Sequence, residues 1–212
     1  SVSAVVVQMP LPVGINSSVV NVIPVEKDVD LLSDKAVGMF FNGRALVDPP
    51  TPRGILNILK ESKIELKNKK IAMFGYGRLV GRFLAPMLIK EGASVSIIEK
   101  DMPQEEAAQV SRNCDIVITA TGQPKFLTGH MIKEGAIVVD SGFSVGIDPV
   151  RGREGSQRPS TSNGIDGKIV GDVDLDSVKD KVSIITPVPG GVGPVGVAEL
   201  FCNVAKLFKY SN

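Results

Sequence analysis

The chain has 212 residues, a formal net charge of +1 and 43% hydrophobic residues, which is enough apolar mass for one substantial core. No basic stretch is long enough to neutralise a run of phosphates, and the few aromatic residues are scattered along the chain. The apolar runs are broken by proline, glycine or charge well before the ~20 residues that a membrane span needs. We therefore expect neither nucleic acid nor a membrane as a partner.

The amino-terminal part predicts a strand followed by irregular chain. Residues 4–7 form a β-branched run typical of a core strand, and the prolines after it end the strand. Gln8 thus stands at a strand end, which is where ligands bind in open α/β sheets. A short helix is predicted over 16–23, and the polar loop beyond it carries Asp28 and Asp30. Turn chemistry and solvation are sufficient to explain Asp28.

The stretch 69–100 predicts a strand, a glycine turn, a helix and a second strand, which together form a nucleotide-binding βαβ unit. Gly75 and Gly77 make the turn, because residues without a Cβ let a pyrophosphate approach the start of the helix. The second strand, Ser94–Ile98, leads into Glu99, 24 positions after Gly75 and close to the ~20 expected for a ribose-binding acid. The glycine spacing is one residue longer than the commonest fingerprint. A tight turn followed by a solvated Glu-Lys pair is therefore the alternative interpretation.

Strand and helix patterns continue to alternate downstream, which favours a parallel sheet and an α/β, Rossmann-like fold class. The helices are predicted over 104–111 and 197–208, and strands over Ile116–Thr119, 137–140 and Val182–Ile185. Residues 143–166 are rich in Gly, Pro, Ser and Arg and predict a long loop, either a lid or a passive insertion. No metal is predicted, because the single histidine, His130, has no Cys, His or carboxylate at metal-ligand spacing.

A series of segments, in their order and spacing, closely resembles the bifunctional methylenetetrahydrofolate dehydrogenase/cyclohydrolase family. The resemblance covers nearly the whole chain, and its most specific parts are TPVPGGVGP and VQMPLP. The segments are VVVQMPLP (5–12), EKDVD (26–30), PPTPRG (49–54), the glycine turn, ATGQPKFLTG (120–129), GDVD (171–174) and TPVPGGVGP (186–194).

The resemblance implies two α/β domains. These are a partial catalytic, folate-binding domain over 1–50 and a Rossmann-like NAD(P)-binding domain over 51–195, with a C-terminal helix over 196–212 that packs back on the first domain. It further implies a homodimer, tetrahydrofolate derivatives as substrates and a cytoplasmic enzyme, with the mitochondrial matrix as the alternative. In the implied reaction a hydride moves from 5,10-methylenetetrahydrofolate to a nicotinamide, and water then opens the methenyl product.

The resemblance also implies roles for single residues. Gln8 and Asp30 take the catalytic positions: Gln8 contacts the folate, and Asp30 holds the pterin, whose 2-aminopyrimidinone edge offers two N–H groups to a carboxylate. The implied substrate-binding residues are Val7, Gln8, Met9, Asp30, Pro189, Gly190, Gly191, Val192 and Gly193. The implied cofactor-binding residues are Gly75, Tyr76, Gly77, Glu99, Thr121, Gly122 and Phe143.

One motif of the family is absent from this sequence. Its catalytic lysine, in a Tyr-x-x-x-Lys motif, should precede Gln8, but the first lysine is Lys27, and neither Tyr76 nor Tyr210 is followed by lysine four residues later. We therefore expect an N-terminally truncated member of the family. The alternative is a non-catalytic dinucleotide-binding module, while TPVPGGVGP disfavours an unrelated Rossmann dehydrogenase.

Cofactor preference is predicted from the residues at two strand ends. The family commonly has Gly-Arg-Ser at the turn and His-Ser after the second strand, polar groups that receive the 2′-phosphate of NADP. Here the turn reads Gly75, Tyr76 and Gly77, and the second position reads Glu99 and Lys100. A carboxylate accepts hydrogen bonds from ribose hydroxyls and repels a 2′-phosphate. The sequence therefore predicts NAD as the preferred cofactor, with NADP as the alternative.

Overall fold

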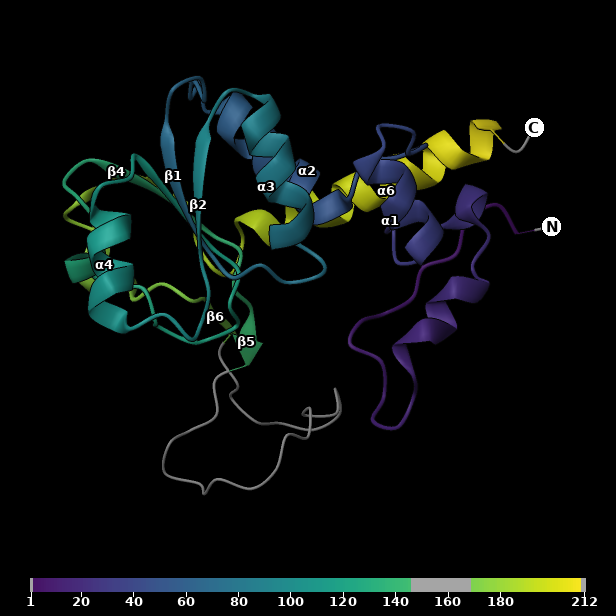
Figure 1. Ribbon diagram of the computed structural model, residues 1–212, viewed down its shortest axis with the longest axis horizontal. Helices are drawn as coiled ribbons and strands as arrows, with labels where there is room; N and C mark the ends of the chain where they lie inside the picture. The colour runs from purple at the N-terminus through teal and green to yellow at the C-terminus, as the bar shows by residue number, and fades with distance from the viewer. Residues whose placement is uncertain (1, 146–168, 211–212) are drawn as a thin grey trace. The chain divides into compact units, whose positions relative to one another are not determined.

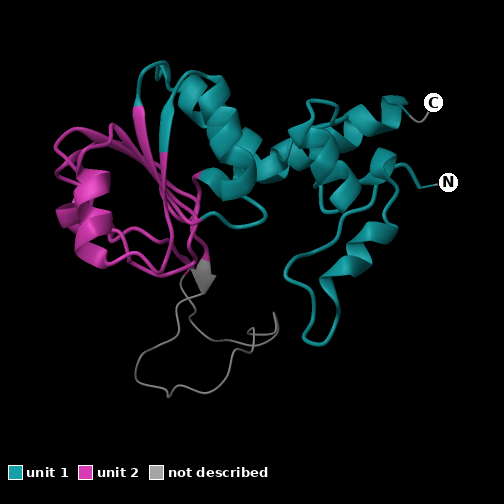
Figure 2. Ribbon diagram, viewed as in Figure 1, with its two compact units in different colours: residues 1–69, 76–95, 192–212 teal, residues 70–75, 96–191 magenta. Residues whose placement is uncertain are grey.

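The computed structural model describes residues 2–145 and 169–210. The loop predicted over 143–166 lies outside these residues except at its first three positions. The described chain divides into two compact units, shown in Figure 2. Unit 1 comprises residues 1–69, 76–95 and 192–212, and unit 2 comprises residues 70–75 and 96–191. The domain boundaries predicted from the sequence stay a prediction.

The main sheet has five strands in the order β2-β1-β3-β4-β7. The pairs β1–β3, β3–β4 and β4–β7 are parallel, and the hydrogen bonds from Ser94 N to Lys69 O and from Gly75 N to Ile98 O show that β2 runs in the same direction as β1. The predicted α/β class with a Rossmann-like parallel sheet is confirmed. The strands are β1 (Lys70–Phe74), β2 (Ser94–Ile98), β3 (Ile116–Thr119), β4 (Ala136–Asp140) and β7 (Val182–Ile185).

The register aligns the last residues of β1, β3 and β4 with one another. Phe74 of β1 pairs with Thr119 of β3, and Thr119 pairs with Asp140 of β4. Strand β3, with the sequence Ile-Val-Ile-Thr, is buried along its whole length, as expected for the middle of a sheet that is covered on both faces. Parallel strands in register place the loops that follow them at the same edge of the sheet.

Helix α4 (Gln104–Arg112) covers the sheet within unit 2 and is labelled in Figure 1. Glu105 and Glu106 stand in its first turn, where negative charge is favourable. Its buried alanines pack against apolar side chains of the strands. The core of unit 2 includes Ala72, Phe74, Ala107, Ala108, Val117, Leu127, Met131, Val138 and Val178. The shorter elements are η3 (Gly129–Met131), α5 (Leu175–Val178) and the small antiparallel pair β5 (Ser144–Val145) and β6 (Ile169–Val170).

Unit 1 is built from helices, of which α2 and α6 pack against each other. Asn203 of α6 is buried and donates to the carbonyls of Val29 and Asp48 at 2.9 and 2.7 Å, which ties this helix to the amino-terminal segment. The core includes Val29, Leu31, Ala36, Val47, Phe83 and Leu207. The elements are η1 (Ser17–Val22), η2 (Val25–Lys27), α1 (Asp34–Phe41), α2 (Pro50–Glu61), α3 (Gly81–Lys90) and α6 (Val192–Tyr210).

Two sequence predictions in unit 1 are wrong. No strand forms over 4–7; Val5 makes a single bridge to Asp28, and Val6 is 56% exposed, because no further strand pairing supports this run within the described residues. The last helix begins at Val192 and not at residue 197. Pro194 falls in its first turn, where a missing N–H has no effect on the helix.

No helix among residues 2–145 and 169–210 is both long enough and apolar enough to cross a membrane.

Candidate functional site

The carboxyl edge of the sheet in unit 2 carries several of the residues predicted to bind the cofactor. Gly75 follows β1, Glu99 follows β2, and Thr121 and Gly122 lie in the loop after β3. Phe143 follows β4, and its side chain is 64% exposed. These positions belong to one edge because the strands run parallel, and this edge is where open α/β sheets bind ligands.

Gly75 can only be glycine in this structure. Its φ is +93°, and a Cβ at this position would lie 2.7 Å from the Ala120 carbonyl oxygen. The Gly75 N–H donates to the Ile98 carbonyl at 3.0 Å, and the Ala120 N–H donates to the Phe74 carbonyl at 2.9 Å. The ends of β1, β2 and β3 are thereby bound together directly at the turn.

The loop after β7 carries the remaining predicted residues of this unit. Pro189 and Gly190 lie in a turn, and the Gly191 N–H donates to the Pro187 carbonyl at 2.8 Å. The loop starts from Thr186, whose hydroxyl accepts from the Asp140 N–H at 2.8 Å. This bond fixes the loop to the end of β4.

Two buried aspartates of this edge are absent from the residues predicted from the sequence. Asp140 ends β4, and Asp172 precedes α5; their exposed fractions are 3% and 0%. Asp140 accepts from the Thr119 hydroxyl at 3.1 Å and from the Gly142 N–H at 2.8 Å. A sequence signal was present for Asp140, because an acid that closes an apolar strand at the carboxyl edge is unusual.

The other predicted residues lie in unit 1. Val7 and Met9 are partly buried and pack against the cluster of Val20, Ile23 and Leu32. Gln8 is exposed, and its side-chain amide donates to the neighbouring Met9 carbonyl at 3.0 Å. Gln8 follows an irregular segment, so the predicted strand end that should have positioned it does not exist. Val192 and Gly193 begin α6 and are therefore helical, whereas the sequence predicted a loop.

Asp30 lies in a turn that is organised by its neighbour Asp28. Asp28 is buried and accepts from the N–H groups of Leu32 and Ser33 at 3.0 and 2.8 Å, and from the Ser33 hydroxyl at 2.7 Å. The prediction of turn chemistry for Asp28 is correct, but solvation is not part of its role. Asp30 is half-buried. Burial, assisted by the charge of Asp28, raises the pKa of Asp30 to about 6.

The glycine turn continues into unit 1 with Tyr76 and Gly77. Arg78 lies in this turn and not on the helix, because α3 begins only at Gly81. The Arg78 guanidinium donates to the carbonyl of Leu32, next to the Asp28 turn. One of the cations near the predicted cofactor loop is thus already bound to backbone.

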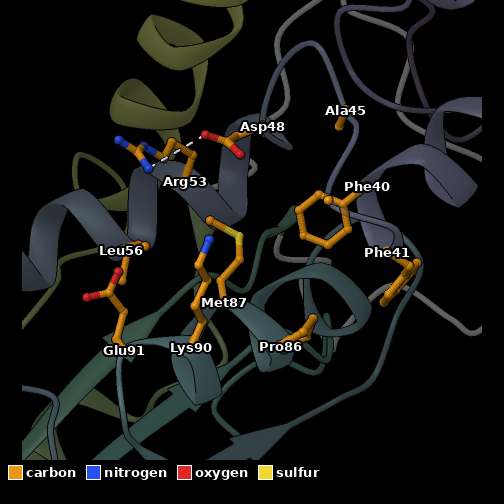
Figure 3. Close-up of a pocket in the computed structure, with 11 residues that line it drawn as sticks. Phe40, Phe41, Ala45, Asp48, Arg53, Leu56, Pro86, Met87, Lys90 and Glu91 are labelled. Carbon is orange, nitrogen blue, oxygen red and sulfur yellow. Dashed lines mark ion pairs between the residues drawn. The ribbon is translucent and has the colours of Figure 1, made fainter.

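A cavity of about 410 Å³ lies within unit 1 and is shown in Figure 3. Its lining combines Phe40, Phe41 and Met87 with the ion pair of Arg53 and Asp48, whose nitrogen and oxygen are 3.6 Å apart. None of its lining residues was predicted to bind substrate or cofactor. In the part of the chain that the structure describes, no group of three or more His, Cys, Asp and Glu side chains is arranged to hold a metal ion.

The chain is similar to proteins of known type along nearly its whole length. Residues 49–212 match the family model of the tetrahydrofolate dehydrogenase/cyclohydrolase, NAD(P)-binding domain. The chain is 37% identical over 210 residues to the bifunctional protein FolD of Clostridium tetani, a match that covers 99% of this chain and 68% of the relative.

Solved structures agree with the sequence comparison. The Trypanosoma brucei N5,N10-methylenetetrahydrofolate dehydrogenase-cyclohydrolase, crystallised with NADP and an inhibitor, superposes with a TM-score of 0.85 at 35% identity, covering 99% of this chain and 67% of that one. The Campylobacter jejuni enzyme FolD gives a TM-score of 0.82 at 36% identity, covering 99% and 68%. The chain spans about two thirds of the length of these relatives. This chain belongs to the tetrahydrofolate dehydrogenase/cyclohydrolase family of enzymes, and residues 49–212 are its NAD(P)-binding domain.

Proposed function

We propose that this protein serves in the NAD-dependent oxidation of 5,10-methylenetetrahydrofolate to 5,10-methenyltetrahydrofolate. The observation that carries the proposal is the carboxyl edge of the sheet in unit 2. There, the glycine turn at Gly75, the acid Glu99 and the loop of Thr121 and Gly122 follow three neighbouring strands. A dinucleotide needs this combination of close backbone approach, a ribose acceptor and loop donors.

The preference for NAD rests on charge. Glu99 is exposed directly after β2, where a carboxylate accepts from the ribose hydroxyls of NAD and repels the 2′-phosphate of NADP. Arg78 donates to the Leu32 carbonyl, so this cation is engaged within unit 1. The NADP complex of the Trypanosoma brucei enzyme, at 35% identity, makes NADP the alternative.

The folate side of the proposal rests on Asp30. A carboxylate accepts two N–H groups from the 2-aminopyrimidinone edge of a pterin, and it does so best when ionised. Burial and the Asp28 charge raise the pKa of Asp30 to about 6, so the side chain is ionised at neutral pH without being fully exposed. Gln8 is exposed and forms only a local bond to the Met9 carbonyl, which a ligand can replace.

The dehydrogenase step chiefly requires that the folate and the dinucleotide are held in the right relative position. A nicotinamide held at the carboxyl edge would supply the hydride acceptor, and the nitrogens beside the methylene carbon of the folate would stabilise the cation. The protein must hold the folate and the dinucleotide close together, and orientation then supplies most of the rate. The cyclohydrolase step also needs a group that activates water.

The cofactor proposal is tested by titrating NAD and NADP separately, by calorimetry, against the unmodified chain, Glu99→Ser and Glu134→Ser. Glu134 is the matched control, because it is an exposed acid at the opposite, amino-terminal end of β4. We expect the unmodified chain to favour NAD, and Glu99→Ser to shift the NAD/NADP affinity ratio about tenfold toward NADP, or ~1.4 kcal/mol. Tighter NADP binding by the unmodified chain, or an equal shift in the control, would refute the assignment.

The alternative function is a dinucleotide-binding module without catalysis. Spectrophotometric assays of methylenetetrahydrofolate oxidation and methenyltetrahydrofolate hydrolysis distinguish the two. Oxidation without hydrolysis supports the proposal, whereas dinucleotide binding without either activity supports the module. We also infer a homodimer, measurable by light scattering, and a cytoplasmic location with the mitochondrial matrix as the alternative.

A further inference from the structure

Asp172 holds the loop that follows β3. Its Oδ2 accepts three hydrogen bonds from this loop: from the Thr121 N–H at 2.7 Å, the Thr121 hydroxyl at 2.8 Å and the Gly122 N–H at 3.3 Å. Its Oδ1 accepts no hydrogen bond within the described residues, although the side chain is fully buried. One carboxylate oxygen therefore accepts all three of these hydrogen bonds from Thr121 and Gly122.

Asp172 is itself held in place by Asp140. Asp140 Oδ1 accepts from the Asp172 N–H at 3.1 Å and from the Gly142 N–H at 2.8 Å, while its Oδ2 accepts from the Val173 N–H at 3.0 Å. The end of β4 thus fixes both the backbone that carries Asp172 and the start of the loop that leads to Phe143. A single network of buried carboxylates joins the loops after β3 and β4.

Glycines make room for this network. A Cβ at Gly142 would overlap the carboxyl group of Asp172, and a Cβ at Gly171 would overlap that of Asp140. The Asp172 carboxylate is consequently packed between the Thr121–Gly122 backbone on one side and Gly142 on the other.

Buried carboxylates stabilise a core less than apolar side chains of similar volume do. Burial raises the pKa of Asp172, the hydrogen bonds from Thr121 lower it, and the charge of Asp140 raises it again. A buried carboxylate with one oxygen unpaired costs stability that an apolar side chain of similar volume would not. The advantage of the arrangement must therefore lie in what it holds, which is the backbone of two loops at the ligand-binding edge.

We propose that Asp172, held by Asp140, is a positioning residue that fixes the Thr121–Gly122 loop and the start of the Gly142–Phe143 loop in the form that receives a dinucleotide. This inference rests on the proposed function, because it takes the carboxyl edge as the dinucleotide site. Asp172 acts through the loop backbone and does not itself touch the cofactor.

The test compares Asp172→Ala, Asp172→Asn and Val178→Ala in the full chain. Val178 is a fully buried residue of α5 and controls for a general loss of core stability. NADH affinity is measured by calorimetry, thermal stability by melting, and local order by amide hydrogen exchange at Thr121 and Gly122. We expect Asp172→Ala to weaken NADH binding at least tenfold and to speed exchange at both amides, while Val178→Ala loses stability but leaves affinity within about twofold.

Asp172→Asn tests whether a side chain of the same shape restores NADH affinity. Its carbonyl oxygen can accept from Thr121 while its amide takes the position of the unpaired Oδ1, so affinity should stay within about threefold of the unmodified chain. If Asp172→Ala does not fold, Thr121→Val decides, because it keeps the Asp172 side chain and removes the hydroxyl that donates to it and accepts from the Gln123 N–H. It should weaken NADH binding threefold to tenfold, and unchanged affinity in that variant would overturn the inference.

The outcomes separate the inference from the proposed function. Failure of the unmodified chain to bind any dinucleotide would refute the proposed function itself. Binding by the unmodified chain together with equal affinity in a folded Asp172→Ala, or an equal loss in Val178→Ala, would refute the positioning role alone.

Discussion

Each unit contains a pair of neighbouring aspartates with a similar arrangement. In the turn of unit 1, Asp28 is buried and accepts from Leu32 and Ser33, while Asp30 stands beside it. At the carboxyl edge of unit 2, Asp140 accepts several backbone N–H groups, while Asp172 stands beside it. In both pairs one carboxylate organises the backbone and the other has a raised pKa.

The two pairs differ in how far the side chain of the second aspartate is buried. Asp172 is fully buried and uses one oxygen to hold a loop, whereas Asp30 is half-buried and remains accessible from outside. Burial beside a second acid fixes the protein's own backbone at Asp172, whereas at Asp30 we propose that it prepares an acceptor for a ligand. Exposure, and not the pKa, distinguishes the two uses.

The largest effect is expected from removing the organising carboxylate of unit 1. Asp28→Ala leaves the donors of Leu32 and Ser33 without their acceptor inside the protein, which should lower the free energy of unfolding by about 3 kcal/mol. The control is Asp34→Ala, an exposed acid on α1 that should cost less than about 1 kcal/mol. Urea denaturation of both variants measures the difference, and similar losses would show that Asp28 does not organise the turn.

The next effect concerns Asp30, the carboxylate that we propose accepts from the pterin. Asp30→Ala should weaken methylenetetrahydrofolate binding by roughly 10- to 100-fold, because it removes a charge-assisted acceptor worth about 1.5–3 kcal/mol. Dinucleotide affinity should stay within a factor of about two, since the predicted roles are separate. Each ligand is titrated by itself in calorimetry, with Asp34→Ala as the control. Equal losses for both ligands would reduce Asp30 to a structural residue.

A smaller effect is a dependence of stability on pH. Near pH 4 Asp30 begins to ionise in the unfolded chain, but in the folded chain it keeps its proton until about pH 6. Its contribution to stability is therefore fully present below about pH 4 and is lost as pH rises through about 6, with a magnitude of about 1–2 kcal/mol after allowance for partial exposure.

The difference in unfolding free energy between the unmodified chain and Asp30→Asn, followed by denaturation from pH 4 to pH 8, isolates this contribution. Asp28→Asn should move the midpoint of the transition to lower pH, because it removes the neighbouring charge. A difference that does not vary with pH would mean that Asp30 titrates alike in the folded and unfolded chain.

The sheet was predictable because its signals are local. The bounds of Ser94–Ile98, Ile116–Thr119 and Val182–Ile185 agree with the prediction, since each is a short segment rich in valine and isoleucine and the chain around it forms helices and turns. Residues 4–7 have the same local signal and form no strand, because a strand also requires a partner. The sequence places the start of α6 too late, because proline and glycine are typical of loops, yet the first turn of a helix accepts both.

The candidate site was predictable only in part. The positions that follow strand ends, such as Gly75 and Glu99, can be found from the order of the elements. The strand-end position of Asp140 and the GDVD segment of Asp172 are visible in the sequence, but their joint role is not, because it arises from a contact across 32 positions. The engagement of Arg78 by the Leu32 carbonyl is likewise a long-range contact, across 46 positions, that no spacing rule indicates.

The alignment of Phe74, Thr119 and Asp140 across three strands has a consequence for protein engineering. Because these strand ends are aligned, the loops that follow them can be exchanged one at a time. A change in the length of one loop leaves the first residues of the other loops in place. Glu99 lies beyond the last residue of β2, so, if the proposed role of Glu99 holds, replacing the segment after Ile98 changes cofactor choice while the paired strands stay in place. The loops after β3 and β4 are the exception, since the Asp140–Asp172 network joins them, and they would have to be grafted together.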